Sequence, residues 1–252
     1  MTDLGEDAGR LLSAVRTALP DNGGFEAYPF KIANYNEAVA KPFQLSYDGD
    51  VFAILVLSTP KMFSGSFKPW LVERCRGVDA TELASTILNP LEDYMKDEMQ
   101  RVVQNIEERV DIYHDFDLWP NRKPKILMCT CGHLTGAAYY YQPSDLLENP
   151  WTDGRSVIGV SLHPRYGGYF AFRCVLIFPK VFVSPTFSPP RPLKILESQE
   201  AIKTAIEAFN FSWQDARFRD YGNPQEKYEE LQTRYFSVPP AERWALLKEW
   251  FA

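Results

Sequence analysis

The stretch that decides the fold runs from Lys125 to Gln142 and reads KILMCTCGHLTGAAYYYQ. Its apolar beginning predicts a strand, and the small residues and three tyrosines at its end predict a turn of helix. Two thiols, one imidazole and three phenols lie within these residues. Two explanations fit this density: a pocket for a large, partly aromatic ligand, or a buried strand–helix junction whose tyrosines fill the core.

The flanking segments predict alternating helices and strands. Residues 6–18 have helical spacing, and the continuous apolar run Phe52–Leu57 predicts a strand buried on both faces. Phe25–Phe30 reads as an edge strand, because Pro29 cannot donate to a sheet ladder. We therefore expect a layered domain of sheet and helices. Further helices are expected over 61–75, 90–107, 198–209, 224–235 and 239–250, and further strands over 110–117, 156–162 and 169–178.

Composition excludes several classes of protein. The chain has 252 residues, 45% hydrophobic and 24% charged, as in ordinary globular proteins. A net charge of -6 gives no bulk attraction to nucleic acid or to anionic lipid. No apolar run approaches the roughly 20 residues of a membrane span. The acidic, polar first residues and the four scattered cysteines lead us to expect a cytoplasmic, reduced protein without a signal peptide.

Standard nucleotide, metal and hydrolase motifs are absent from the sequence. There is no glycine-rich phosphate loop and no G-x-G-x-x-G after a predicted strand. There is no H-E-x-x-H or paired C-x-x-C, so a metal site built from the chain's own ligands is not expected. No G-x-S-x-G supports a hydrolase nucleophile.

The thiols and the imidazole each allow two interpretations. Cys129 and Cys131 would share one face of a strand, where they could bind a soft metal or act in redox chemistry; otherwise they are small buried hydrophobes. His133 begins an H-x-x-G, which occurs in a cobalt-ligating D-x-H-x-x-G signature. Cys131 stands where that signature has its orienting Asp, so a hydrogen-bonded structural histidine is the alternative.

Three arginines suggest a cationic site. Arg173 lies in the middle of an apolar strand, where a charge is costly unless it is paired or faces a cavity. Arg219 and Arg243 lie near the C-terminus. If the three converge, they can bind carboxylates in bidentate fashion. The alternative is three separate ion pairs with nearby Asp or Glu.

Eight segments in one order, covering residues 25–247, together resemble the MMACHC (cblC) family of cobalamin-processing proteins. This resemblance is far more specific than any single motif. The segments are FEAYPF, LVLSTPKMF, PNRKPKIL, HLTGAAYYYQ, HPRYGGYFAFR, FNFSWQDARFRD, NPQEKY and RYFSVPPAERWALL.

The resemblance implies an α+β fold of the flavin-reductase (nitroreductase-like) type, with an antiparallel or mixed sheet flanked by helices and a large ligand cavity. It implies one domain over 1–252, in which the proline-rich residues 179–197 connect to the C-terminal helices. It further implies a partner of the cblD type and a monomer or ligand-dependent homodimer, with no role for nucleic acid or membrane.

The implied activity is removal of the upper axial ligand of cobalamin, which the family binds base-off. Alkylcobalamins would lose the alkyl group to glutathione, and cyanocobalamin would lose cyanide in a reductive reaction with FMN or FAD. Thiol oxidation is an implied side activity. A non-catalytic cobalamin carrier and a plain flavin reductase are the rival interpretations.

The resemblance also transfers site residues. Glutathione-binding arginines fall on Arg173, Arg219 and Arg243. In this chain Cys129, Cys131 and Gly132 replace residues typical of the family, and a one-residue insertion near 156 places Ile158 within one position of the family's contact. The expected cobalamin contacts and pocket residues are Asp115, Ile126, Leu127, Met128, Cys129, His133, Tyr140, Tyr141, Gln142, Ile158, Phe172 and Tyr228.

Overall fold

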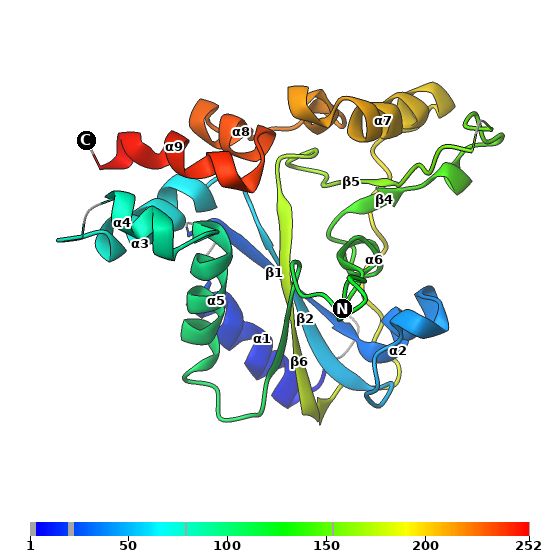
Figure 1. Cartoon of the computed structure of the whole chain (residues 1–252). Coiled ribbons are helices and arrows are strands. Elements are labelled where there is room, and N and C mark those ends of the chain that lie inside the picture. Colours follow the sequence, from blue (N-terminus) through cyan, green and yellow to red (C-terminus); the bar gives the residue numbers. More distant parts are fainter. Residues whose placement is uncertain (1–3, 20–22, 79, 153, 252) are drawn as a thin grey trace.

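The computed structural model describes residues 4–19, 23–78, 80–152 and 154–251. At its centre is a four-stranded sheet in the order β1-β2-β6-β3, antiparallel throughout (Figure 1). The strands are β1 (Phe25–Lys31), β2 (Val51–Ser58), β6 (Ala171–Phe182) and β3 (Asp111–His114). Two predictions are confirmed: β2 is buried at every position, and β1, which contains Pro29, lies at an edge.

One face of the sheet is covered by four helical segments (Figure 1). Phe52, Ile54 and Val56 of β2 point into this layer and form the larger core. These segments confirm the helices expected over 6–18, 61–75 and 90–107, to within a few residues. They are α1 (Glu6–Ala18), a π-helix (Phe63–Phe67), α3 (Lys68–Arg74) and α5 (Pro90–Val103).

The opposite face is covered by α2 (Ile32–Ala38) and α6 (Met128–Leu134). The alternate residues of β2, Ala53, Leu55 and Leu57, point into this second core. Successive side chains of a strand point to opposite faces, so one continuous apolar run supplies both cores.

A second, two-stranded sheet lies beyond α6. Strands β4 (Tyr139–Tyr141) and β5 (Val160–Leu162) pair antiparallel and pack against α7 (Gln199–Phe211), as Figure 1 shows. The hydroxyl of Ser198 accepts a hydrogen bond from the backbone N–H of Ala201 at 3.1 Å and so caps α7. The helix expected over 198–209 is therefore confirmed.

The decisive stretch is built in the reverse order of the prediction. The residues around the cysteines form α6, where a strand was predicted, and the tyrosines form β4, where a helical turn was predicted. Tyrosine favours strands, and pairing with β5 satisfies its backbone groups, whereas α6 is held by packing on the main sheet. On a helix, Cys129 and Cys131 point in different directions rather than to one face: Cys131 is fully buried and Cys129 is partly exposed.

Other element boundaries also differ from the prediction, and the strand expected over 156–162 is regular only at Val160–Leu162. Strand β6 continues through Pro179 to Phe182, so the first four residues of the expected proline-rich connection are strand. A register shift between Val51 and Phe52 leaves Pro179 opposite a bulge, where no ladder donor is required. The expected C-terminal helices are shorter: α8 spans Glu230–Ser237, and α9 spans Arg243–Leu247 between the 3-10 turns Pro240–Glu242 and Lys248–Trp250.

The remaining regular elements are short. They are α4 (Ala80–Thr86) and 3-10 turns at Lys41–Phe43, Pro143–Asp145, Trp213–Asp215 and Arg217–Asp220. Among the described residues, no helix has the length and hydropathy that crossing a membrane requires.

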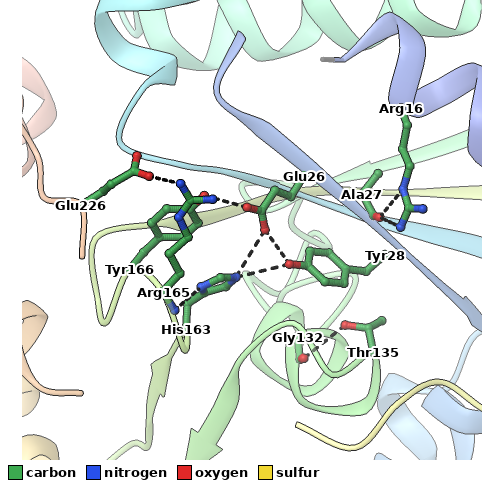
Figure 2. A network of polar contacts seen from close by, with 10 residues as sticks. All are labelled: Arg16, Glu26, Ala27, Tyr28, Gly132, Thr135, His163, Arg165, Tyr166 and Glu226. Carbon is green, nitrogen blue, oxygen red and sulfur yellow. Dashed lines mark hydrogen bonds and ion pairs between the residues drawn. The ribbon is translucent and has the colours of Figure 1, made fainter. Parts of the chain in front are cut away.

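A buried polar network ties β1 to the turn that precedes β6 (Figure 2). The carboxylate of Glu26 accepts hydrogen bonds from the hydroxyls of Tyr28 (2.5 Å) and Tyr166 (2.7 Å) and lies 3.3 Å from Nε2 of His163. The backbone N–H of Arg165 donates to Nδ1 of His163, so the proton of the neutral ring is assigned to Nε2, which faces Glu26. This network fixes the turn from which Phe172 and Arg173 continue.

Candidate functional site

Two pockets adjoin at the end of β3 and the start of β6. The larger, which we call the wide pocket, has a volume of about 650 Å³ and lies between the end of α2, the start of α6, β4 and β6. Eight of the twelve predicted contact residues line it. These are Asp115, Ile126, Leu127, Met128, Cys129, Tyr140, Gln142 and Phe172.

The first turn of α6 shapes one wall of the wide pocket. The backbone N–H of Leu127 donates to the hydroxyl of Tyr35 at 3.0 Å, which fixes the entry into the helix. Gly132 allows the ring of Phe172 to lie directly on α6, since a Cβ at Gly132 would be 2.1 Å from Cζ of Phe172. Burial raises the pKa of the Cys129 thiol, so this side chain is a neutral part of the wall rather than a reactive thiolate.

Strand β4 sends its tyrosines in different directions. Tyr140 lines the wide pocket. Tyr141 is fully buried on the other side, where its hydroxyl accepts hydrogen bonds from the backbone N–H groups of Ile195 and Leu196, each at 2.7 Å. Tyr139 packs edge-on against the ring of His133. One of the three phenols therefore lines the wide pocket.

The smaller pocket, which we call the arginine pocket, has a volume of about 260 Å³. Arg173 from β6 and Arg243 from the start of α9 both line it. Their guanidinium carbons lie 5.9 and 5.8 Å from the centre of the Phe236 ring. Residues far apart in the chain thus place two positive charges on one aromatic ring.

Arg173 has unused hydrogen-bonding capacity. It is only 5% exposed, and its Nε donates to the hydroxyl of Ser58 at 2.7 Å. One terminal nitrogen is buried without a hydrogen-bond partner. An unsatisfied buried donor on a cation is costly, so a ligand anion that reached this nitrogen would bind strongly.

Arg219 does not line the arginine pocket and is separated from it by aromatic rings. Its guanidinium donates to the backbone oxygen of Gly168 and stacks 4.9 Å from the centre of the Tyr228 ring. That ring lies 5.3 Å from the ring of Phe236. Within the described residues, Arg173, Arg219 and Arg243 form no ion pair with a carboxylate, which contradicts the alternative of three separate ion pairs.

Asp115 and Ala171 line both pockets and so mark their junction. Asp115 follows β3, and its backbone N–H donates to the carbonyl oxygen of Arg173 at 3.0 Å. The side chain of Asp115 is exposed to solvent at this junction. The protein atoms around its carboxylate nevertheless displace part of its hydration and raise its pKa to about 6, although the charge of Arg173 acts in the opposite direction.

Four predicted residues lie outside the wide pocket: Tyr141, Tyr228, His133 and Ile158. His133 lines a separate pocket of about 420 Å³ beside the proline-rich segment 188–192. Its Nδ1 accepts a hydrogen bond from the backbone N–H of Tyr140 at 3.1 Å, and burial lowers its pKa, as in a structural histidine. Ile158 is 58% exposed. No group of three or more potential metal ligands occurs in the described part of the chain.

Both pockets have further lining residues that no sequence motif indicates. Phe43 lines the wide pocket from a 3-10 turn after α2, and Phe236 and Glu92 line the arginine pocket. Glu92 lies in the first turn of α5, and burial raises its pKa. The sequence RYFSVPP gives no motif for Phe236; only its contact with two arginines, formed by the fold, identifies it.

Comparisons with known proteins agree with this architecture. A family model described as the methylmalonic aciduria and homocystinuria type C family matches residues 24–247. The chain is similar to a solved structure, that of a B12-trafficking protein CblC of Caenorhabditis elegans described as a human MMACHC homologue. The TM-score is 0.91 at 42% sequence identity, and the match covers 96% of both chains.

Curated relatives cover most of the chain as well. A protein of Caenorhabditis elegans named "MMACHC-like protein" is 44% identical over 246 residues, 92% of this chain and 90% of the relative. A human protein named "Cyanocobalamin reductase / alkylcobalamin dealkylase" is 41% identical over 225 residues, 89% of this chain and 76% of the relative.

Proposed function

The chain belongs to the methylmalonic aciduria and homocystinuria type C family, and from this membership we propose that it is a cytoplasmic enzyme that removes the upper axial ligand of cobalamin. The observation that carries the proposal is the junction of the two pockets at Asp115 and Ala171. A cobalamin bound base-off in the wide pocket would present its upper ligand near this junction, and glutathione in the arginine pocket would meet it there.

For alkylcobalamins the chain supplies binding and orientation. Arg173 and Arg243 hold the carboxylates of glutathione, and Arg219 completes the positive wall behind Tyr228. Positive charge also favours the thiolate over the thiol. The sulfur attacks the alkyl carbon in line with the cobalt–carbon bond, whose electron pair stays on cobalt. Holding the two reactants in this geometry supplies a large part of the rate.

For cyanocobalamin an external reductant is required, and we propose reduced FMN or FAD. The flavin would supply electrons. The same proposal includes six further features that the family resemblance implies. They are a nitroreductase-like fold type, a large cavity, a single domain, a cblD-type partner, a thiol oxidase side activity and a ligand-dependent dimer.

An absorbance titration tests this function. Apoprotein is titrated with methylcobalamin and then mixed anaerobically with glutathione. We expect a shift to the base-off spectrum, followed by the spectrum of cobalt(I). A base-off shift without reaction would instead identify a cobalamin carrier, and the absence of any shift would contradict cobalamin binding.

A further inference from the structure

We propose that Asp115 is the base that takes the proton from the glutathione thiol. This inference rests on the proposed dealkylation and adds to it a residue that acts on the thiol. Among the described residues, Asp115 is the one carboxylate that lines both pockets; Glu92 lines the arginine pocket alone. A thiol that enters from the arginine pocket towards a ligand in the wide pocket must pass this carboxylate.

The carboxylate of Asp115 is free to accept a proton. In the described part of the structure its side chain forms no hydrogen bond or ion pair with another side chain. The residue is held instead through its backbone, which is bonded to Arg173. The backbone at Asp115 is therefore fixed beside Arg173, and the carboxylate has no side-chain partner that a ligand would have to displace.

The surrounding charges suit a proton transfer from sulfur to oxygen. The transfer moves one negative charge from Asp115 to the sulfur, towards Arg173 and Arg243, so the charge of the pocket stays constant. Partial loss of hydration raises the pKa of Asp115 to about 6, closer to that of a thiol, near 8.5. The titratable or charged groups that face Asp115 are Arg173, Glu92, Asp117, Arg243, Cys129 and Tyr140.

The step is balanced without a further reactant. The S–H bond breaks and its proton passes to the Asp115 carboxylate. The thiolate sulfur forms a bond to the alkyl carbon, and the cobalt–carbon bond breaks with both electrons left on cobalt, which is reduced from cobalt(III) to cobalt(I). The protonated Asp115 then returns its proton to solvent, with which it is in contact.

The test compares two nucleophiles in wild type and Asp115→Asn. Asparagine has the same size but accepts no proton from a thiol. With glutathione and methylcobalamin we expect the variant to lose roughly 10²-fold in rate at pH 7, the usual size of general-base catalysis. With the selenol analogue of glutathione, already ionised at this pH, we expect a rate within about threefold of wild type.

Two controls make the result specific. Glu92→Gln removes the other carboxylate of the arginine pocket, and we expect it to affect both nucleophiles equally. In wild type, the rate with glutathione should fall as the pH decreases through about 6, because a protonated Asp115 accepts no proton. Asp115→Asn should show no inflection near pH 6; its rate should instead fall about tenfold per pH unit at every pH below the pKa of the thiol, near 8.5.

Equal losses with thiol and selenol, or no loss with either, would overturn the assignment. If the asparagine variant fails to bind methylcobalamin, Asp115→Glu decides: an inflection at acid pH like that of wild type supports the base, and its absence contradicts it. A different result would contradict the proposed function itself: wild type would then fail to bind or to dealkylate methylcobalamin.

Discussion

Arg173 has an unpaired buried donor, which lowers stability, and we propose that it binds glutathione. Its buried terminal nitrogen has no hydrogen-bond partner, and it shares the arginine pocket with Arg243. We expect Arg173→Gln to lower the rate of dealkylation at sub-saturating glutathione by about 10- to 100-fold, the equivalent of one charge-assisted contact of about 1.5–3 kcal/mol. Binding of methylcobalamin should persist, because Arg173 does not line the wide pocket.

The measurement for this variant is cobalt(I) formation against glutathione concentration, beside the base-off titration. Arg217→Gln is a matched control, since Arg217 is exposed and pairs with Asp215. A rate equal to that of wild type in Arg173→Gln would remove this arginine from the glutathione site.

Gly132 determines the wall of the wide pocket by having no side chain. In Gly132→Ala the new methyl would overlap the ring of Phe172, which must move into the pocket. We expect weaker methylcobalamin binding and a loss of about 1–3 kcal/mol in the free energy of unfolding, as for overpacked cores. Titration and urea denaturation measure the two effects.

Gly9→Ala serves as the control for this glycine, because a Cβ at Gly9 would lie in open space within α1. Alanine there should raise the stability by up to about 1 kcal/mol, because it favours the helix. Unchanged ligand binding in Gly132→Ala would show that Phe172 does not form the binding surface.

At the scale of elements, β4 separates a pocket residue from a core residue. We expect Tyr140→Ala to weaken methylcobalamin binding with little change in stability. Tyr141→Phe should instead lower the free energy of unfolding by about 1–3 kcal/mol, because two backbone N–H groups lose their acceptor, and should leave binding unchanged. Titration and thermal unfolding of both variants check this. The reverse outcome would exchange the roles of the two tyrosines.

The error in the decisive stretch has a physical cause at the same scale. Its first residues have strand propensity, but α6 is a seven-residue helix that packs on β6 of the main sheet and on β4 and β5 of the second sheet, so tertiary packing overrides local preference. Phe52–Leu57 was predictable, because a run that is apolar on both faces admits few alternatives. The tyrosines could be recognised as important, but only pairing with β5 decides which of them is exposed to the pocket.

At the scale of the whole molecule, the pockets depend on contacts that no local pattern encodes. The family resemblance placed Asp115, Arg173 and Arg243 among the site residues, but their junction results from β3, β6 and α9 meeting at one end of the sheet. For the same reason, the sequence did not identify Phe236 as a pocket residue. The sequence thus indicated which side chains carry chemistry, and the tertiary structure decided which of them share a pocket.

The network of Figure 2 joins β1 to the turn before β6 and makes the free energy of unfolding of the whole molecule depend on pH in the acid range. Burial alone would raise the pKa of Glu26, but hydrogen bonds from His163, Tyr28 and Tyr166 outweigh it and lower this pKa to about 2. Because the pKa is lower in the folded state, the stabilisation is complete above the ordinary value of about 4.5 and is lost as the pH falls through 2.

We expect wild type to lose roughly 3 kcal/mol of unfolding free energy through this group between pH 5 and pH 2, since each pKa unit corresponds to about 1.4 kcal/mol. Glu26→Gln should be less stable at pH 7 and should lack this part of the pH dependence. Urea denaturation across this pH range measures both. Glu197→Gln is the matched control, since Glu197 is exposed. If both variants kept the wild-type pH dependence, the carboxylate of Glu26 would not be the group that joins β1 to the turn, and other carboxylates would have to account for the loss in acid.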